Sequence, residues 1–310
     1  MSALICGSMA YDNIMLFDGH FKDHILPDKV HMLNVAFLVP ELRRNFGGCA
    51  GNIAYNLKLL GGDGHAMGTV GQDFKPYAEW LKQHGIDDRY LKVIDDAYTA
   101  QAYITTDKDD NQITAFHPGA MNCSHENVVP TDAGVSLGII APDGRDGMVQ
   151  HALQFAEAGI PFVFDPGQGL PMFDGDDLLT FIDQATYVAV NDYESQMLAD
   201  RTGLSPADIA KRVDALIVTR GGEGSIIYTE GKRLDIAAVR PSELKDPTGC
   251  GDAYRAGLLF GLMNDFDWTT VGNIASLMGS LKIAHNGTQN HAFSADEFAS
   301  RFKDAFGYAF

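Results

Sequence analysis

Short apolar runs alternate with amphipathic stretches in the second half of the chain. Four apolar runs each end in a polar or glycine-containing segment: 135–141, 161–165, 186–191 and 215–219. Apolar residues with helical spacing lie between them, at 148–158 and 192–201. Strands that alternate with helices form a parallel sheet that is covered on both faces. The pattern therefore predicts an α/β core, in which ligands bind beyond the carboxyl ends of the strands.

The first half of the chain follows a different pattern. A short buried strand is expected at 3–6. Strand-like segments rich in β-branched and aromatic residues follow at about 14–39 and 99–116. Between these segments, apolar residues have helical spacing at 52–60 and 76–84. The two strand-like segments therefore interrupt the core pattern as insertions.

We predict a single domain over residues 1–310. Its three-layer core has a mainly parallel sheet, and insertions near 14–42 and 97–118 form a small β-sheet lid. A length of 310 residues and an apolar content of 45% supply ample material for such a core.

Charge and cysteine content narrow the class of protein. The formal net charge of -18 argues against nucleic acid or anionic membrane as a partner. The four cysteines are far apart and form no C-x-x-C pair, which argues against a zinc site or a disulfide framework. Neither a basic signal-peptide start nor an apolar run of membrane-spanning length is present, so we expect a cytoplasmic protein.

The segment DPTGCGD, at 246–252, carries the most chemical information. Its glycine-rich turn runs into an apolar stretch with helical spacing at 253–263. Backbone N–H groups at a helix start attract negative charge, whereas a carboxylate there repels phosphate. Asp252 is explained if it accepts a proton from a hydroxyl while the N–H groups stabilise a transferring phosphoryl group. This combination predicts a kinase.

Four further segments suit ligand binding, and each has an ordinary structural alternative. Asp12 follows the first strand and suits a vicinal diol or a turn, and Asn52 follows a glycine-rich turn and suits a hydroxyl or a helix cap. Asn191 and Glu194 have the spacing to orient magnesium-bound water, or to cap a helix. The loop 219–224 suits a nucleotide, or simply joins two strands of a hairpin.

Together and in this order, these segments resemble the ribokinase family, also called the phosphofructokinase B family. Four motifs carry the resemblance, which covers essentially the whole chain: GGCAGN at 47–52, N-x-x-E at 191–194, T-x-G-x-x-G at 219–224 and DPTGCGD at 246–252. Pro247 and Cys250 stand where threonine and alanine are more usual in the family. Proline removes one backbone donor, so the anion cradle must rely on the residues that follow it.

The resemblance implies a Rossmann-like, ribokinase-like fold with ATP as phosphoryl donor and Mg²⁺ as required metal. Some relatives also hold a monovalent cation such as K⁺, here near Asp246 and Thr248. The catalytic base matches Asp252, and the anion hole matches Gly249, Cys250 and Gly251. The substrate-binding positions match Ser8, Asp12, Gly48 and Asn52. The nucleotide positions match Asn191 and Glu194 (which also orient Mg²⁺ through water), Thr219, Gly221, Gly224 and the stretch 273–287 with Asn273 and His285.

The lid indicates the acceptor. The segment 31–39 is unusually apolar for a lid over a free sugar, and a nucleobase needs apolar and aromatic walls. Phe37 and Phe116 are candidate contacts for the base; alternatively, they pack the lid against itself or against a second subunit. The segments GSMAYD and FHPGAM also resemble adenosine and broad-specificity nucleoside kinases. We therefore predict phosphorylation of the 5′-hydroxyl of a ribonucleoside such as adenosine or inosine.

Other functions remain open at this point. A sugar kinase acting on ribose or fructose is the nearest alternative, and a catalytically silent nucleoside-binding protein is another. A dinucleotide oxidoreductase is poorly supported, because no strand-linked G-x-G-x-x-G opens the chain. Pairing of two lids in a homodimer stays open as well.

Overall fold

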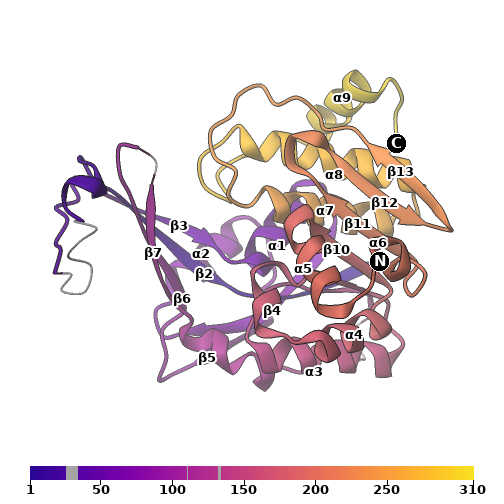
Figure 1. Ribbon diagram of the computed structural model, residues 1–310, viewed down its shortest axis with the longest axis horizontal. Helices are drawn as coiled ribbons and strands as arrows, with labels where there is room; N and C mark the ends of the chain where they lie inside the picture. Colours follow the sequence, from indigo (N-terminus) through magenta and orange to yellow (C-terminus); the bar gives the residue numbers. More distant parts are fainter. Residues whose placement is uncertain (26–33, 110, 132–133) are drawn as a thin grey trace.

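A nine-stranded sheet forms the centre of the molecule, for which the computed structural model describes residues 1–25, 34–109, 111–131 and 134–310 (Figure 1). The strand order is β13-β12-β11-β10-β9-β8-β1-β4-β5. The strands are β1 (Ser2–Cys6), β4 (Asp63–Gly71), β5 (Tyr90–Ile94), β8 (Val135–Ile140), β9 (Phe162–Phe164), β10 (Tyr187–Asn191), β11 (Ala215–Thr219), β12 (Ser225–Thr229) and β13 (Lys232–Ile236). Pairing is parallel from β11 to β5, and only the two pairs that include β12 are antiparallel. The mainly parallel sheet that the sequence predicts is confirmed.

Helices cover both faces of this sheet. The α-helices are α1 (Cys49–Leu59), α2 (Lys75–Gln83), α3 (Arg145–Ala158), α4 (Gly175–Gln184), α5 (Asp192–Thr202), α6 (Pro206–Ile209), α7 (Cys250–Met263), α8 (Trp268–Ile283) and α9 (Ala295–Phe306). Short 3₁₀ helices are η1 (Phe21–Asp23), η3 (Gly119–Glu126), η4 (Gly167–Met172) and η5 (Gly221–Glu223). Helices α1, α2, α7 and α8 pack in one core with side chains such as Ile5 and Ile217. Helices α3 to α6 pack in a second core with the alternate side chains, such as Leu4 and Leu216.

The two cores follow from the geometry of a strand. Successive side chains of a strand point to opposite faces, so Leu4 and Ile5 enter different cores. Both side chains are fully buried, which explains why the core strands read as continuous apolar runs. Helix α9 adds an outer layer, where Phe298 and Phe302 pack on α8. The sheet and the helices on its two faces form the three-layer α/β core that the sequence predicts.

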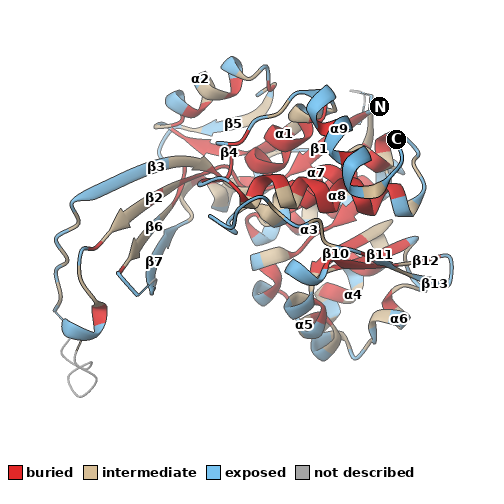
Figure 2. Cartoon of the chain, turned by 90° about the horizontal axis from the view of Figure 1, so that it is seen from above, coloured by how far each residue is buried: buried red, intermediate tan, exposed pale blue. Residues whose placement is uncertain are grey.

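A second, four-stranded sheet projects to one side of the core (Figure 1). Its order is β3-β2-β6-β7, with strands β2 (Ala10–Leu16), β3 (Glu41–Gly47), β6 (Ala100–Thr106) and β7 (Gln112–His117). The outer pairs are antiparallel, and the central pair of β2 and β6 is parallel. Figure 2 shows that the outer strands β3 and β7 of this small sheet are largely exposed and its central strands β2 and β6 mostly are not, while the helices α1, α7 and α8 are largely buried. We keep the name lid for these four strands.

The sequence pattern located some elements better than others. The strand expected at 215–219 agrees with β11, and the helix expected at 192–201 agrees with α5 within one residue. Strand β4 and helix α8 were not expected as elements. Glycines interrupt the period-2 pattern of β4, and α8 is apolar on nearly all sides because α7 and α9 flank it. Part of the apolar segment predicted at 31–39 lies outside the described residues.

Among the described residues, no helix combines the length and the apolar character that crossing a bilayer requires.

Candidate active site

The carboxyl ends of the parallel strands bring polar residues from distant parts of the chain to one edge of the sheet. Ser8 lies just beyond β1, Asp165 just beyond β9, and Asn191 and Thr219 end the paired strands β10 and β11. Parallel strands point the same way, so their carboxyl ends share an edge. The N-termini of α1 and α7 meet at this edge, because Asn52 of α1 contacts Asp252 of α7.

The central contact of the site joins the two glycine-rich motifs. The Asn52 side-chain amide donates to Oδ2 of Asp252 at 2.8 Å across 200 residues of sequence. Burial raises the pKa of Asp252 to about 6; the Asn52 hydrogen bond opposes this shift, and the charge of Asp165 adds to it. A carboxylate with a pKa near neutrality is well suited to accept a proton. The structure thus brings together two residues that the sequence predicted for one site.

The turn before Asp252 forms the N-terminus of α7. Gly249 caps the helix with φ of 78°, a conformation that favours glycine. The Cys250 N–H donates to the Pro247 carbonyl at 3.1 Å, so this donor of the predicted anion hole closes the turn itself. A Cβ atom added at Gly251 would meet no atom within 4 Å, which places open space beside that residue. Gly249 and Gly251 are therefore the better donors for a bound anion.

Asp12 extends the site onto the lid. Burial raises the pKa of Asp12 to about 6, and the charge of Asp246 adds to the shift. A Cβ atom at Gly47 would lie only 2.5 Å from Oδ2 of Asp12, so this close approach requires glycine. Gly48 has φ of 85° and packs on the Ser8 backbone, and the Ser8 hydroxyl accepts from the N–H of Cys49 at 3.1 Å. Ser8 and Gly48 therefore shape the start of α1 beside Asp12.

A buried ion pair that the sequence analysis did not identify lies beside Asp252. Arg255, one turn further along α7, donates Nε and Nη2 to the two carboxylate oxygens of Asp165 at 3.0 and 3.1 Å. Both side chains are at most 8% exposed. The charges of this pair reach both Asp252 and Glu194. The signal in the sequence is a charged residue one turn after the predicted catalytic residue Asp252, inside an apolar helix.

A second buried network holds Asn52 in place. Gln289, 2% exposed, donates from Nε2 to Oδ1 of Asn52 at 3.0 Å and to the Tyr77 hydroxyl at 2.6 Å. Its Oε1 accepts from the Trp80 indole at 2.9 Å, and Tyr77 donates to the Gly47 carbonyl at 2.8 Å. These bonds orient the amide of Asn52 with its NH₂ group toward Asp252. No local motif distinguishes Gln289, so sequence reasoning did not identify it.

Asn191 and Glu194 form a capping box at the start of α5. Asn191 Oδ1 accepts from the Glu194 N–H at 2.7 Å, and Glu194 Oε2 accepts from the Asn191 N–H at 2.8 Å. Burial raises the pKa of Glu194, and the nearby charge of Asp165 adds to the shift. The structural alternative that the sequence left open for this pair is therefore present. The box uses one oxygen of each side chain, and the other oxygen of Glu194 remains for a further contact.

The predicted nucleotide residues are spread over three elements. The loop 219–224 joins β11 to β12 as a hairpin with η5 at its centre, and Gly221 and Gly224 both have positive φ. Asn273, on α8, donates to the Tyr308 hydroxyl at 3.1 Å. His285 follows α8, and its Nδ1 lies 3.1 Å from the Leu281 carbonyl oxygen. Their predicted contacts with a nucleotide stay predictions.

The two lid phenylalanines have different surroundings. The Phe37 ring lies 4.9 Å from the Phe17 ring and 5.0 Å from the Phe21 ring, so it packs against other residues of the segment that joins β2 to β3. Phe116, in contrast, is 53% exposed. Phe116 pairs with Ala102, which pairs with Asp12, so these side chains share one face of the lid. Of the two rings, Phe116 therefore lies in line with Asp12, the predicted substrate-binding residue.

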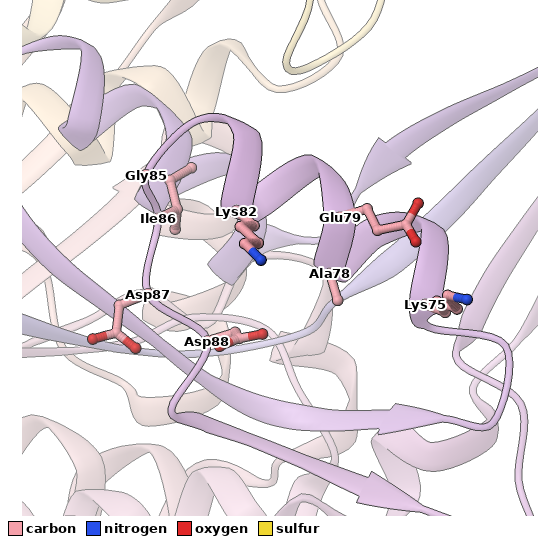
Figure 3. A pocket seen from close by; sticks show the side chains of 8 residues that line it. All are labelled: Lys75, Ala78, Glu79, Lys82, Gly85, Ile86, Asp87 and Asp88. Atoms are coloured by element: carbon pink, nitrogen blue, oxygen red, sulfur yellow. The ribbon is translucent and has the colours of Figure 1, made fainter.

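A separate surface hollow lies along the outer side of α2 (Figure 3). Charged side chains including Lys75, Lys82, Asp87 and Asp88 line it, and no predicted site residue is among them. The hollow therefore belongs to a different part of the molecule from the candidate active site.

Comparison with known proteins places the chain among kinases. The family model described as pfkB family carbohydrate kinase matches residues 12–295. A nucleoside kinase of Methanocaldococcus jannaschii is 32% identical over 272 residues, which cover 87% of this chain and 89% of that protein. A nucleoside kinase of Methanothermobacter thermautotrophicus is 31% identical, with 97% and 99% covered.

Solved structures give a similar result. The structure of Burkholderia thailandensis nucleoside kinase in complex with inosine is 55% identical, covers 99% of both chains and has a TM-score of 0.90. The same protein has also been solved in complex with ADP-inosine, where it is 56% identical with a TM-score of 0.88 and covers 99% of this chain and 97% of that one.

Proposed function

The chain belongs to the pfkB family of carbohydrate kinases, and from that membership we propose that it transfers the γ-phosphoryl group of ATP to the 5′-hydroxyl of a purine ribonucleoside. One observation carries the proposal: the carboxylate of Asp252 lies at the N-terminus of α7, bound by Asn52 and with its pKa raised to about 6. A proton acceptor and a set of anion-binding N–H groups thus meet at one point.

In the proposed reaction, Asp252 accepts the proton of the 5′-hydroxyl as that oxygen forms a bond to the γ-phosphorus. The bond from phosphorus to the bridging oxygen breaks, and ADP leaves with the electron pair. Backbone N–H groups of Gly249 and Gly251 stabilise the charge on the transferring group. Most of the rate acceleration then comes from positioning and charge stabilisation, because the protein forms no covalent bond.

ATP enters this reaction as its magnesium complex. Carboxylate and amide oxygens are the ligand chemistry that Mg²⁺ accepts, and Asn191 and Glu194 supply both. The capping box already uses Asn191 Oδ1 and Glu194 Oε2. We therefore assign the remaining oxygen of Glu194 to a water on the metal. When bound, the metal neutralises charge on the phosphate oxygens.

Two observations favour a nucleoside over a free sugar as acceptor. The nucleoside kinase of B. thailandensis, solved with inosine, is similar over nearly the whole chain. In addition, Phe116 of β7 and Asp12 of β2 lie on the same face of the lid, with one strand, β6, between them. At roughly 4.8 Å between neighbouring strands, the two residues are about 10 Å apart. Ala102 lies between them and leaves room for a ligand. The span matches a molecule with a hydroxylated end and an aromatic end.

Turnover of a panel of acceptors tests this proposal. Inosine, adenosine, ribose and fructose are each incubated with ATP and Mg²⁺, and the phosphorylated product is identified. We expect rapid turnover of the purine nucleosides and slow turnover of the sugars. Turnover of ribose or fructose alone would support the sugar-kinase alternative, and no turnover of any acceptor would favour a nucleoside-binding protein.

The base assignment has its own test. Asp252→Asn keeps an oxygen for the Asn52 amide but cannot accept a proton. We expect kcat to fall by about 10²–10⁴-fold, with nucleoside binding by calorimetry little changed. Asp304→Asn, on the exposed side of α9, removes a carboxylate elsewhere and serves as the matched control. Full activity of the Asp252 variant would refute the assignment.

We also propose that two copies associate through their lids. Strand β3 is an edge of the small sheet, and it exposes Leu42 at 66%, with Leu38 nearby at 86%. The edge of β3 offers backbone N–H and C=O groups for pairing with a second copy, and Leu42 adds apolar surface beside the charged Glu41, Arg43 and Arg44. Light scattering should give twice the chain mass, and Leu42→Arg should give the single mass. The single mass for the unaltered protein would contradict pairing.

For the location of the protein, we propose the cytoplasm. All four cysteines are free thiols, and they lie in separate parts of the fold. Free thiols are usual where glutathione and thioredoxin keep proteins reduced, which is also where ATP is abundant.

A further inference from the structure

A lysine ammonium is buried directly behind the anion-binding turn. Lys282, in the last turn of α8, is 0% exposed. Its Nζ donates to the backbone oxygens of Asp246 at 2.8 Å and His285 at 3.3 Å, and lies 3.9 Å from Oδ2 of Asp246. Lysine is almost never fully buried unless it is paired, because an ammonium loses its hydration there. A role for this charge is therefore to be expected.

The partners of Lys282 are the kind that hold a metal cation. Backbone carbonyls together with a carboxylate are the oxygen ligands of hard cations, and rings of carbonyls bind K⁺. The position near Asp246 and Thr248, where some relatives hold a monovalent cation, lies in this same segment. The structure fills it with a side chain of the protein: the ammonium donates to two backbone oxygens, one in the segment before α7 and one after α8. The residues present therefore do not fit a free monovalent cation.

Asp246 extends the contact into both neighbouring loops. Its carboxylate accepts from the N–H of Thr248 at 2.9 Å and from the N–H of Gly287 at 2.8 Å. The Asp246 N–H donates to the Ile283 carbonyl at 3.2 Å, next to Lys282 in sequence. The ammonium and this carboxylate thus join the turn before α7 to the loop after α8. The position of the anion-binding turn depends on that junction.

The ammonium also acts on the turn through its charge. Burial lowers the pKa of Lys282, and the nearby Asp246, Cys250 and Asp252 oppose this shift. All three of these groups belong to the segment 246–252, which includes the turn that we assign to the phosphoryl group. The charge of Lys282 is thus felt at the turn, in a chain whose formal net charge is -18.

We propose that Lys282 is a built-in replacement for the monovalent cation, which holds the anion-binding turn in place and stabilises phosphoryl transfer without K⁺. The inference rests on the proposed kinase function, although its test is separate. Lys282 is a positioning residue in this account, because it acts on the reacting group through the turn. It follows that the reaction proceeds at full rate without any added monovalent metal ion.

The unaltered protein provides the first test. Nucleoside phosphorylation is measured with tetramethylammonium as the only monovalent cation, and then with K⁺ at the same ionic strength. We expect equal kcat and equal KM for ATP in both buffers. A severalfold activation by K⁺ would overturn the inference while leaving the kinase function intact. No phosphorylation in either buffer would instead count against the proposed function.

A variant provides the second test. Lys282→Met keeps the length of the side chain and removes its charge. We expect kcat to fall by about 10²-fold, as when a charge-stabilising group is lost, and to recover partly with K⁺ or NH₄⁺. K⁺ should also raise the Tm of this variant and leave that of the unaltered protein unchanged. Lys303→Met, at an exposed position of α9, is the control and should respond to neither ion.

The outcomes separate clearly. A folded Lys282→Met protein with full activity in tetramethylammonium would overturn the inference. Loss of activity with no recovery in K⁺ and no rise in Tm would overturn the cation-replacement role as well. Should this variant fail to fold, the comparison of buffers with the unaltered protein still decides the question.

Discussion

Two carboxyl groups with raised pKa values define the chemistry at the scale of single residues. Asp12 and Asp252 both have pKa values of about 6, and burial is the main cause for each. The charge of Asp12 also raises the pKa of Asp252. Asp12 therefore contributes to the raised pKa of Asp252, and burial and the charge of Asp165 contribute more.

The raised pKa of Asp252 predicts that activity falls on the acid side of the pH profile. Below a pH of about 6, kcat/KM for the nucleoside should fall, because protonated Asp252 cannot accept a proton. In Asp12→Asn the midpoint of this limb should move to lower pH, since the negative neighbour that raises the pKa of Asp252 is gone. Initial rates at subsaturating nucleoside measure both profiles. Asp18→Asn, an exposed carboxylate, should leave the midpoint unchanged, and an unmoved midpoint in Asp12→Asn would refute the coupling.

The hydrogen-bond network around Gln289 predicts that a different substitution moves the midpoint of the acid limb to higher pH. Gln289→Glu places a carboxylate against Oδ1 of Asn52, so the Asn52 amide should turn and present its oxygen to Asp252. The hydrogen bond that lowers the pKa of Asp252 is then lost, and the acid limb should move to higher pH. The same pH profile measures this change. Gln83→Glu, exposed on α2, is the control; a loss of stability alone, with the midpoint unmoved, would limit Gln289 to a structural role.

At the scale of elements, α7 organises the site. Its N-terminus carries the anion-binding turn and Asp252, and its next turn carries Arg255, which reaches across to Asp165 after β9. Helical spacing places Asp252 and Arg255 on one side of α7, since residues three apart are neighbours. The helix therefore joins the chemistry to the central sheet through one buried ion pair.

Removing one partner of this pair should be costly. Arg255→Met leaves the buried carboxylate of Asp165 without its cation, and the free energy of unfolding should fall by about 3–5 kcal/mol. The double variant Arg255→Met, Asp165→Asn removes both charges and should recover much of that loss. Urea denaturation followed by circular dichroism measures both changes. Equal losses in the single and double variants would show that the buried charge is not the cause.

Elements and motifs differed in how far they could be predicted. The runs 135–141 and 215–219 identify strands, because residues buried on both faces must all be apolar. Helix α8 lacks an amphipathic pattern because neighbours flank it on several sides. The spacing of Asn191 and Glu194 fits a helix cap and a metal-binding motif equally well, since both uses need the same side chains at the same spacing.

At the scale of the whole molecule, the lid and the core contribute different parts of the site. Among the predicted site residues, Asp252 and Asn52 lie on α7 and α1 of the core, and Asp12 and Phe116 lie on β2 and β7 of the lid. A nucleoside bridging the two would cover the exposed ring of Phe116 and exclude water from the reacting hydroxyl.

Phe116→Ala tests this division of the site. We expect KM for inosine to rise by about tenfold, from the loss of aromatic contact, with Tm unchanged because the ring is 53% exposed. Ile113→Ala is the matched control, since Ile113 lies on the same strand with its side chain on the opposite face of the lid. Steady-state kinetics measure both variants. An equal rise of KM in the control would contradict a specific contact with the base.

The sequence by itself determined the α/β architecture and the reaction class, and it predicted Asp252 as the proton acceptor, because each depends on local pattern: strand and helix periodicity, and a carboxylate in a glycine-rich turn at a helix start. The tertiary structure alone decided which distant residues support that chemistry. Asn52 meets Asp252, Gln289 orients Asn52, and Lys282 lies behind the turn, through contacts that span up to 237 residues of sequence. Such contacts leave no local signature, since a buried polar side chain is chosen by its partners in space and not by its neighbours in the chain.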